Sequence, residues 1–322
     1  MKQPNDALSD YLRLREKLFP FSSLDKHIKS SAAQQMSHRH HYIPQYFIEG
    51  FTNDEHLLWI YDKQKDTILK KLRPSRSLFY EENRNSVDIG AEKPLPVFEE
   101  AYSVLDKLLP AAIRLLRSET NIAIDVFIEL VSHLNVLVID LFWRNINTDF
   151  YFDLLLKYSK LNITVDDQKL TELDIKHLQD QPGFKQLVRM NMARNALKHA
   201  TQKDQDRQFT AELIVFPMDQ LCLGDMPFLF ESAPIEDNDL VILSALIPIS
   251  KRKLLIRNIK QPKAFTLKET QYLNAILIDE SSKYICAANK DILASAVNVY
   301  KNISSINMLD EVKKLIFSSE SS

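Results

Sequence analysis

The stretch LLWIYDKQKDTIL, residues 57–69, indicates the type of fold that this chain adopts. Its first five residues, Leu57 to Tyr61, are aliphatic or aromatic, and Thr67 to Leu69 form a second, shorter run. Only polar residues separate the two runs, a pattern that is typical of a β-hairpin. We therefore predict a pair of antiparallel strands in this part of the chain.

The last third of the sequence adds further short apolar runs that suit strands. Proline and glycine residues, among them Pro217, Gly224 and Pro227, separate these runs. We predict strands at residues 213–216, 221–223, 228–230, 241–249 and 254–256.

The middle of the chain is predicted to be helical. Apolar residues recur at helical spacing from Phe98 to Leu116, although Pro110 should kink or split that helix. The most apolar stretch, residues 121–144, is long enough to raise the question of a membrane span. Charged side chains interrupt it, and a charge inside a bilayer costs roughly 2.5–3.5 kcal/mol on insertion scales. We therefore predict a buried core helix and no membrane partner.

The rest of the chain completes a helix-rich architecture. Thr266 and Glu269 have the spacing of a capping box at the start of one helix. Residues 1–36 are predicted to be a helical N-terminal extension and linker, and residues 37–322 a single α+β domain with a helix-rich core packed on a mainly antiparallel sheet. Further helices are predicted at about 148–161, 171–180, 184–201, 267–281, 290–301 and 307–318.

The composition excludes several common classes of protein. Only four glycines occur among 322 residues, and no two have the spacing of a dinucleotide-binding turn, a phosphate loop or a nucleophile elbow. Cys222 and Cys286 are too few for a disulfide scaffold or a four-thiolate zinc site. The polar start, Met1 to Asp10, lacks the apolar core of a signal peptide, so we expect a cytoplasmic protein.

The overall charge is close to neutral, with 41 basic and 43 acidic side chains. Such a chain has no strong global attraction for nucleic acid. Each of its small basic clusters is either a solvated strand end or part of a nucleic-acid groove. The clusters consist of Lys70, Lys71, Arg73 and Arg76, and of Lys251 to Lys253.

The first candidate for chemistry is the segment HRHHYIPQ, residues 38–45, which holds three histidines in four residues. Neutral imidazole is a metal ligand and a general base near neutral pH, and Pro44 fixes the backbone close by. One interpretation places His40 and His41 in a catalytic or metal site. The other is that both side chains bond to the backbone at the entry to the hairpin.

Two further candidates lie later in the chain. Asp225 follows Gly224 in a tight turn, where its carboxylate either serves chemistry or bonds to its own turn. Arg144 follows Asp140 at the spacing of an ion pair on a helix, and its guanidinium is either structural or free to reach a substrate anion.

The segment His40 to Phe51, followed by Leu58 to Asp62, resembles the opening signature of a bacterial family called domain of unknown function 4238. The resemblance covers about residues 38–300, and Met226 replaces the asparagine that is usual in the family's turn. The family name implies no reaction. Weaker matches follow in the family's order at Leu141–Arg144, Gly224–Pro227, Leu246–Ser250 and Tyr272–Asn274, with Tyr284.

One hypothesis for the function is a metal-dependent hydrolase that acts on nucleic acid. His40 and His41, followed by Ile43 and Pro44, are similar to the first motif of His-Asn-His nucleases, where a histidine activates water and a divalent ion stabilises the transition state. The wider-spaced asparagine and final histidine of those enzymes are missing, because Asn53 and His56 are only three residues apart. A toxin or defence effector is one setting for such an enzyme.

On this hypothesis His41, Arg144 and Asp225 are catalytic, and His40, His41 and Asp225 bind a divalent metal such as Mg²⁺ or Mn²⁺. Nucleic acid is then the expected partner. The alternative is a non-catalytic binding or protein-interaction module in which these residues are structural. The two hypotheses differ in whether imidazole, guanidinium and carboxylate meet at one pocket.

Overall fold

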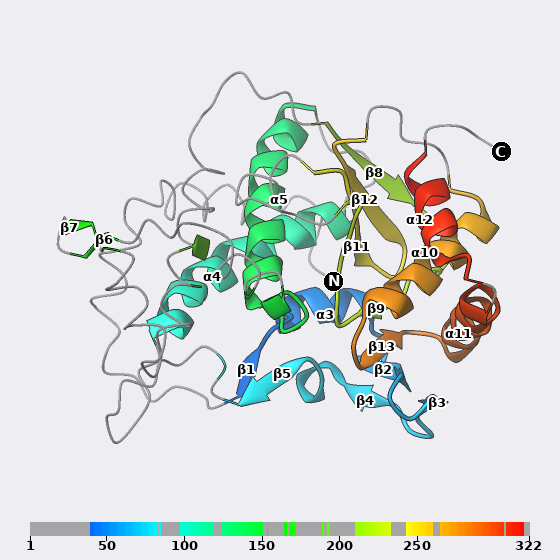
Figure 1. The fold of residues 1–322 in the computed structure, drawn as a ribbon. Helices are drawn as coiled ribbons and strands as arrows, with labels where there is room; N and C mark the ends of the chain where they lie inside the picture. The colour runs from blue at the N-terminus through cyan, green and yellow to red at the C-terminus, as the bar shows by residue number, and fades with distance from the viewer. Residues whose placement is uncertain are drawn as a thin grey trace.

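The computed structural model describes most of the chain between Arg39 and Ser318 (Figure 1). The predicted N-terminal extension lies outside the described residues, as do most of the helices predicted at 148–161, 171–180 and 184–201. The described residues are 39–82, 84, 97–118, 124–150, 153, 164–165, 168–169, 171, 189, 192–193, 210–232, 243–259, 265–305 and 307–318.

Two long helices pack against each other in the first half of the described chain. Helix α4 (Val97–Ser118) continues through Pro110, so the proline does not split it. Helix α5 (Ile124–Arg144) is the predicted core helix, and all its side chains from His133 onward are buried. No helix among the described residues combines the length and the apolar character that a membrane crossing requires.

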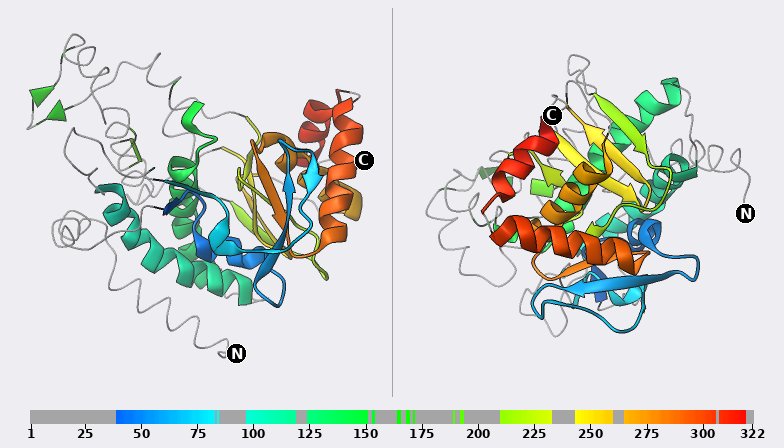
Figure 2. Two further views of the ribbon diagram at one scale, coloured as in Figure 1. Left: turned by 90° about the horizontal axis from the view of Figure 1, so that it is seen from below. Right: turned by 90° about the vertical axis from the view of Figure 1, so that its right-hand side faces the viewer.

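A four-stranded antiparallel sheet lies between α5 on one side and the C-terminal helices on the other (Figures 1 and 2). All residues of its two central strands are buried, and their register shifts between Pro248 and Ser250 because a proline has no N–H for the ladder. Its strands, in order across the sheet, are β10 (Leu229–Phe230), β11 (Ala245–Ser250), β12 (Lys253–Arg257) and β8 (Ala211–Val215).

A second antiparallel sheet contains the hairpin predicted from residues 57–69, which is confirmed. Its central strand β13 (Tyr284–Ala287) joins that hairpin to a strand from a distant part of the chain. The strands run in the order β3 (Thr67–Ile68), β2 (Leu57–Asp62), β13 and β9 (Leu223–Gly224), and β4 (Arg73–Pro74) pairs with the start of β2.

A separate two-stranded ladder contains His40 and His41 of the histidine segment. Strand β1 (Arg39–His41) pairs antiparallel with β5 (Tyr80–Glu82). After Pro44 the chain turns into helix α3 (Gln45–Ile48) and the 3-10 helix η2 (Glu49–Phe51), while the 3-10 helix η3 (Ser75–Ser77) precedes β5. The pair β6 (Thr164–Val165) and β7 (Gln168–Lys169) forms a separate two-stranded ladder.

The C-terminal helices match their predicted positions closely. The predicted capping box is present, because the Thr266 hydroxyl accepts from the Glu269 N–H and the Glu269 carboxylate accepts from the Thr266 N–H. Helix α10 packs against both of the helices that follow it. The helices are α10 (Leu267–Glu280), α11 (Lys290–Ser305) and α12 (Leu309–Phe317).

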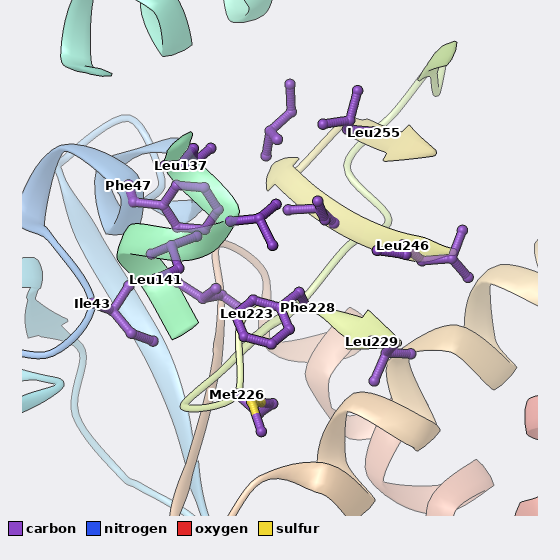
Figure 3. Packing of buried hydrophobic residues seen from close by; sticks show 14 of the residues in the cluster. Ile43, Phe47, Leu137, Leu141, Leu223, Met226, Phe228, Leu229, Leu246 and Leu255 are labelled. Atoms are coloured by element: carbon purple, nitrogen blue, oxygen red, sulfur yellow. The ribbon is translucent and has the colours of Figure 1, made fainter. Parts of the chain in front are cut away.

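One apolar core joins the sheets to the long helices, which confirms the α+β class (Figure 3). Leu137 and Leu141 of α5 meet Phe47 of α3 and Phe228, which precedes β10, and all four side chains are buried. The α3 segment therefore cannot move without disturbing the packing of both α5 and the sheet.

Arg117, at the end of α4, ties this helix to two other elements. Its guanidinium donates to the carbonyl oxygens of Tyr46, Phe47 and Ile249 at 2.7, 2.8 and 2.7 Å. Burial of the cation lowers its pKa to about 10. Gly50 leaves the space for this contact, because a Cβ at that position would meet the guanidinium.

We predict that Arg117→Met lowers the free energy of unfolding by about 3 kcal/mol or more, because three carbonyls lose their donor. Chemical denaturation followed by circular dichroism measures the change. The control is Arg114→Met, on the exposed face of the same helix, which should change stability by less than about 0.5 kcal/mol. Equal losses in the two variants would contradict the assignment of a bridging role to Arg117.

Candidate functional site

The histidine segment places the imidazole of His41 at a pocket. His41 lies opposite Tyr80 in the β1–β5 ladder, and their ring centroids are 5.9 Å apart. Its Nε2 lies 3.3 Å from the Nε2 of Gln45 in α3. The imidazole is only partly buried, so it is accessible from the solvent.

His40 points the other way. Adjacent residues of a strand direct their side chains to opposite faces, and His40 is opposite Glu81 in the ladder rather than Tyr80. The His40 side chain is 2% exposed, whereas His41 lines the pocket. The ladder therefore separates the two imidazoles that the sequence places side by side.

The pocket beside His41 has a volume of about 280 Å³ and is mostly polar. It brings together β1, α3, α4 and the end of α5, which are distant in sequence. Its lining consists of Arg39, His41, Pro44, Gln45, Tyr46, Asp106 and Arg144. His41 and Arg144, two of the predicted catalytic residues, thus line the same pocket.

Arg144 is a buried cation between two carboxylates. Its Nε donates to Asp140 at 2.7 Å, the ion pair expected from their spacing, and its two terminal nitrogens donate to Asp106 of α4 at 2.9 and 3.3 Å. The Arg144 side chain is 4% exposed and that of Asp106 is 41% exposed. The fork of Arg144 therefore holds the Asp106 carboxylate in one orientation at the pocket.

Tyr46 supplies a hydroxyl group with unusual surroundings. Tyr46 lines the pocket, and its hydroxyl oxygen is buried with no hydrogen-bond partner among the described residues. Burial, together with the nearby carboxylates of Asp140 and Asp106, raises the pKa of the phenol well above its ordinary value. A buried hydroxyl without a partner is costly, so a ligand that accepts a hydrogen bond from it would be stabilised.

Asp225 is completely buried and is not among the residues that line the pocket. Its carboxylate accepts from the backbone N–H groups of Ser282, Lys283 and Tyr284 at 2.8–3.1 Å. It also accepts from the Asn147 side chain at 2.9 Å and the Ser282 hydroxyl at 3.2 Å. The carboxylate therefore joins three segments of the fold, and it does so across the chain rather than within its own turn.

Close packing explains why a glycine, Gly224, precedes Asp225. A Cβ at Gly224 would meet the Ser281 hydroxyl and approach the carbonyl oxygen of Leu277. Close contact with the end of α10, rather than a left-handed backbone, requires glycine here.

The part of the chain that the structure describes offers no set of ligands for the predicted metal. Among the described residues, no group of three or more His, Cys, Asp or Glu side chains is arranged to hold a metal ion. Metal binding by His40, His41 and Asp225 stays a prediction, and so do the catalytic roles of His41, Arg144 and Asp225.

Sequence reasoning missed Tyr46 and Asp106 as pocket residues. Tyr46 lies directly after the histidine segment, so its nearness to His41 in the sequence could have identified it as a pocket residue. Asp106 lies 38 residues before Arg144 and on another helix, so only the packing of α4 on α5 brings them together.

We predict that Asp225→Asn lowers the free energy of unfolding by about 3 kcal/mol or more. The amide has one acceptor oxygen where the carboxylate has two, so some of the buried donors lose their acceptor. Chemical denaturation measures the loss. The exposed Asp54→Asn is the matched control, with an expected change below about 0.5 kcal/mol. A stability for Asp225→Asn equal to that of the unaltered chain would show that the carboxylate has no structural role.

Comparison with known proteins identifies one family. The family model described as "Protein of unknown function (DUF4238)" matches residues 39–291. No curated protein and no solved structure matched the chain.

Proposed function

We propose that this protein, a member of the DUF4238 family, binds a phosphodiester at the His41 pocket and hydrolyses it. The description of the family names no reaction, so the proposal is argued from the residues of the pocket. The observation that supports this best is the meeting of four chemical groups at one polar pocket. They are the imidazole of His41, the carboxylate of Asp106, the guanidinium of Arg144 and the unpartnered hydroxyl of Tyr46.

Hydrogen-bond donors at the pocket favour an anionic, oxygen-rich ligand. The Tyr46 phenol keeps its proton, since its pKa is raised, and it can donate to a phosphoryl oxygen. Arg39 lies at the exposed side of the pocket with its guanidinium 5.0 Å from the centre of the Tyr80 ring. These two donors come from β1 and α3, on either side of Pro44.

His41 is the group that would transfer protons. Neutral imidazole can accept a proton and imidazolium can donate one, which suits this side chain type to general acid–base catalysis. In the proposed step His41 takes a proton from water, the water oxygen forms a bond to phosphorus, and the bond to the leaving oxygen breaks. The imidazolium then returns the proton to that oxygen, so that water and diester give a monoester and an alcohol.

Asp106 and Arg144 have supporting roles in this proposal. Asp106 accepts a hydrogen bond from the attacking water and orients it, and Arg144 is a positioning residue because it holds Asp106 through two hydrogen bonds. The described residues that line the pocket include only two of the side-chain types that hold a metal ion, His41 and Asp106, so no step proposed here uses a metal. Because the sequence predicts a divalent metal, the assay has arms with Mg²⁺, with Mn²⁺ and with a chelator.

A second candidate is a binding module without catalysis. It is favoured by the two carboxylates around Arg144, which compensate a buried cation as in many purely structural sites. In that case the pocket binds an anion through Tyr46 and Arg39, and His41 transfers no proton.

We predict that the purified protein hydrolyses bis(p-nitrophenyl) phosphate and that His41→Asn lowers kcat/KM by about 100-fold or more. The loss follows because asparagine cannot exchange a proton near neutral pH. The control is His56→Asn, at an exposed position with φ 60°, which asparagine tolerates. Equal activity of the His41 and His56 variants, or no hydrolysis by the unaltered chain in any metal arm, favours the binding module.

We predict opposite effects of Tyr46→Phe on stability and on function. Removal of a buried hydroxyl without a partner should leave the free energy of unfolding unchanged or raise it by about 1 kcal/mol. Loss of one donor to the substrate should lower kcat/KM by about tenfold. The control is Tyr61→Phe, which should lose stability because its hydroxyl donates to Asp66 at 2.7 Å. A clear loss of stability in Tyr46→Phe would sink the ligand-binding role of this hydroxyl.

A further inference from the structure

A run of exposed cations leads away from the pocket. Lys70, Lys71, Arg73 and Arg76 are all exposed, and no acidic residue occurs from Thr67 to Tyr80. We call these four residues the basic segment. Its local charge contrasts with the nearly neutral charge of the whole chain.

The charges of the basic segment are not compensated within the described part of the chain. None of its four cations forms an ion pair there, whereas Arg84, Arg144 and Lys251 are each paired with carboxylates. Uncompensated cations on one surface attract a polyanion.

The backbone that bears these cations is fixed by the fold. Arg73 and Pro74 form strand β4 and pair with the start of β2. Beyond η3, Leu78 and Phe79 are buried, and Phe79 is held at φ 54° with its carbonyl accepting from Tyr42 N–H at 2.9 Å. The fold therefore fixes the backbone at Arg73 and just after Arg76, which reduces the backbone entropy lost when a ligand binds.

The basic segment is continuous with the His41 pocket. The 3-10 helix η3 packs against α3, which contributes Gln45 and Tyr46 to the pocket. Tyr80 follows and contacts both Arg39 and His41. Figure 1 shows β4, β5 and β1 along one edge of the molecule, below α3. Glu81 and Glu82 of β5 end the run of positive charge beyond Tyr80.

We propose that the substrate is a nucleic-acid strand whose phosphates lie along the basic segment while one diester enters the His41 pocket. This rests on the proposed phosphodiester hydrolysis. A strand with one phosphate per nucleotide fits a row of cations that ends at a pocket with donors for a phosphoryl oxygen. Tyr80 lies between the cations and the pocket with the exposed Arg39 guanidinium 5.0 Å from its ring centre, and the plane of that guanidinium is a surface on which a base can stack.

Binding of a labelled thymidine oligonucleotide of about 20 nucleotides tests this proposal, with fluorescence anisotropy measured at several salt concentrations. The test variant changes Lys70, Lys71, Arg73 and Arg76 to Gln. The control changes four exposed cations elsewhere to Gln and so has the same net charge: Arg114, Lys268, Lys290 and Lys314.

The unaltered chain should bind the oligonucleotide, and the test variant should bind it at least about tenfold more weakly at low salt. The slope of log affinity against log salt should fall by up to about 3, since each phosphate contact contributes about 0.7 on single strands. The control variant should lose less than about twofold. Thermal denaturation of each variant shows whether it is folded.

Two results would overturn the proposal: no binding by the unaltered chain at low salt, or equal weakening in both variants. Its failure can be told from failure of the hydrolase proposal. Binding is measured without turnover, whereas bis(p-nitrophenyl) phosphate is too small to reach the basic segment and reports on the pocket alone.

Discussion

The structure depends on how it compensates the buried guanidinium of Arg144. A cation that is 4% exposed must be paired, because leaving it alone in the interior would cost several kcal/mol. Asp140, one turn earlier, provides one carboxylate, and Asp106 provides the other from α4. The ion pair between Arg144 and Asp106 fixes how α4 lies on α5. The Asp106 side chain stays partly exposed and lines the pocket. Structural stability and the proposed chemistry thus share one ion-pair network.

The residues after Arg144 extend this constraint to the sheets. Asn145 donates to the backbone carbonyl of Asp225 at 2.6 Å, and Asn147 donates to its carboxylate. Asp225 in turn holds the loop that leads into β13. Because β13 pairs with β2, the end of α5 is connected to the hairpin and to the segment that bears the cations. Asp225 therefore links the end of α5 to the second sheet, and it is not among the residues that line the pocket.

The fold could be predicted from sequence where local patterns decide it. The hairpin at residues 57–69, the buried α5 and the capping box at Thr266 each follow from periodicity or spacing, and the structure has them. The site could be predicted only in part. His41 and Arg144 line one pocket, but Asp106 joins them through helix packing that no local pattern reports. His40 is turned away by the alternation of side chains along β1, a short strand that its polar sequence does not suggest.

In the proposed mechanism His41 and Asp106 act as one unit at the pocket, and this coupling can be measured. A double-mutant cycle tests it directly, with kcat/KM for phosphodiester hydrolysis measured for His41→Asn, Asp106→Asn and the double variant. Residues that act together show strongly non-additive losses, so the double variant should be about as active as His41→Asn alone. Losses that simply multiply would mean that the two groups act independently, and an unimpaired Asp106→Asn would remove the carboxylate from the site.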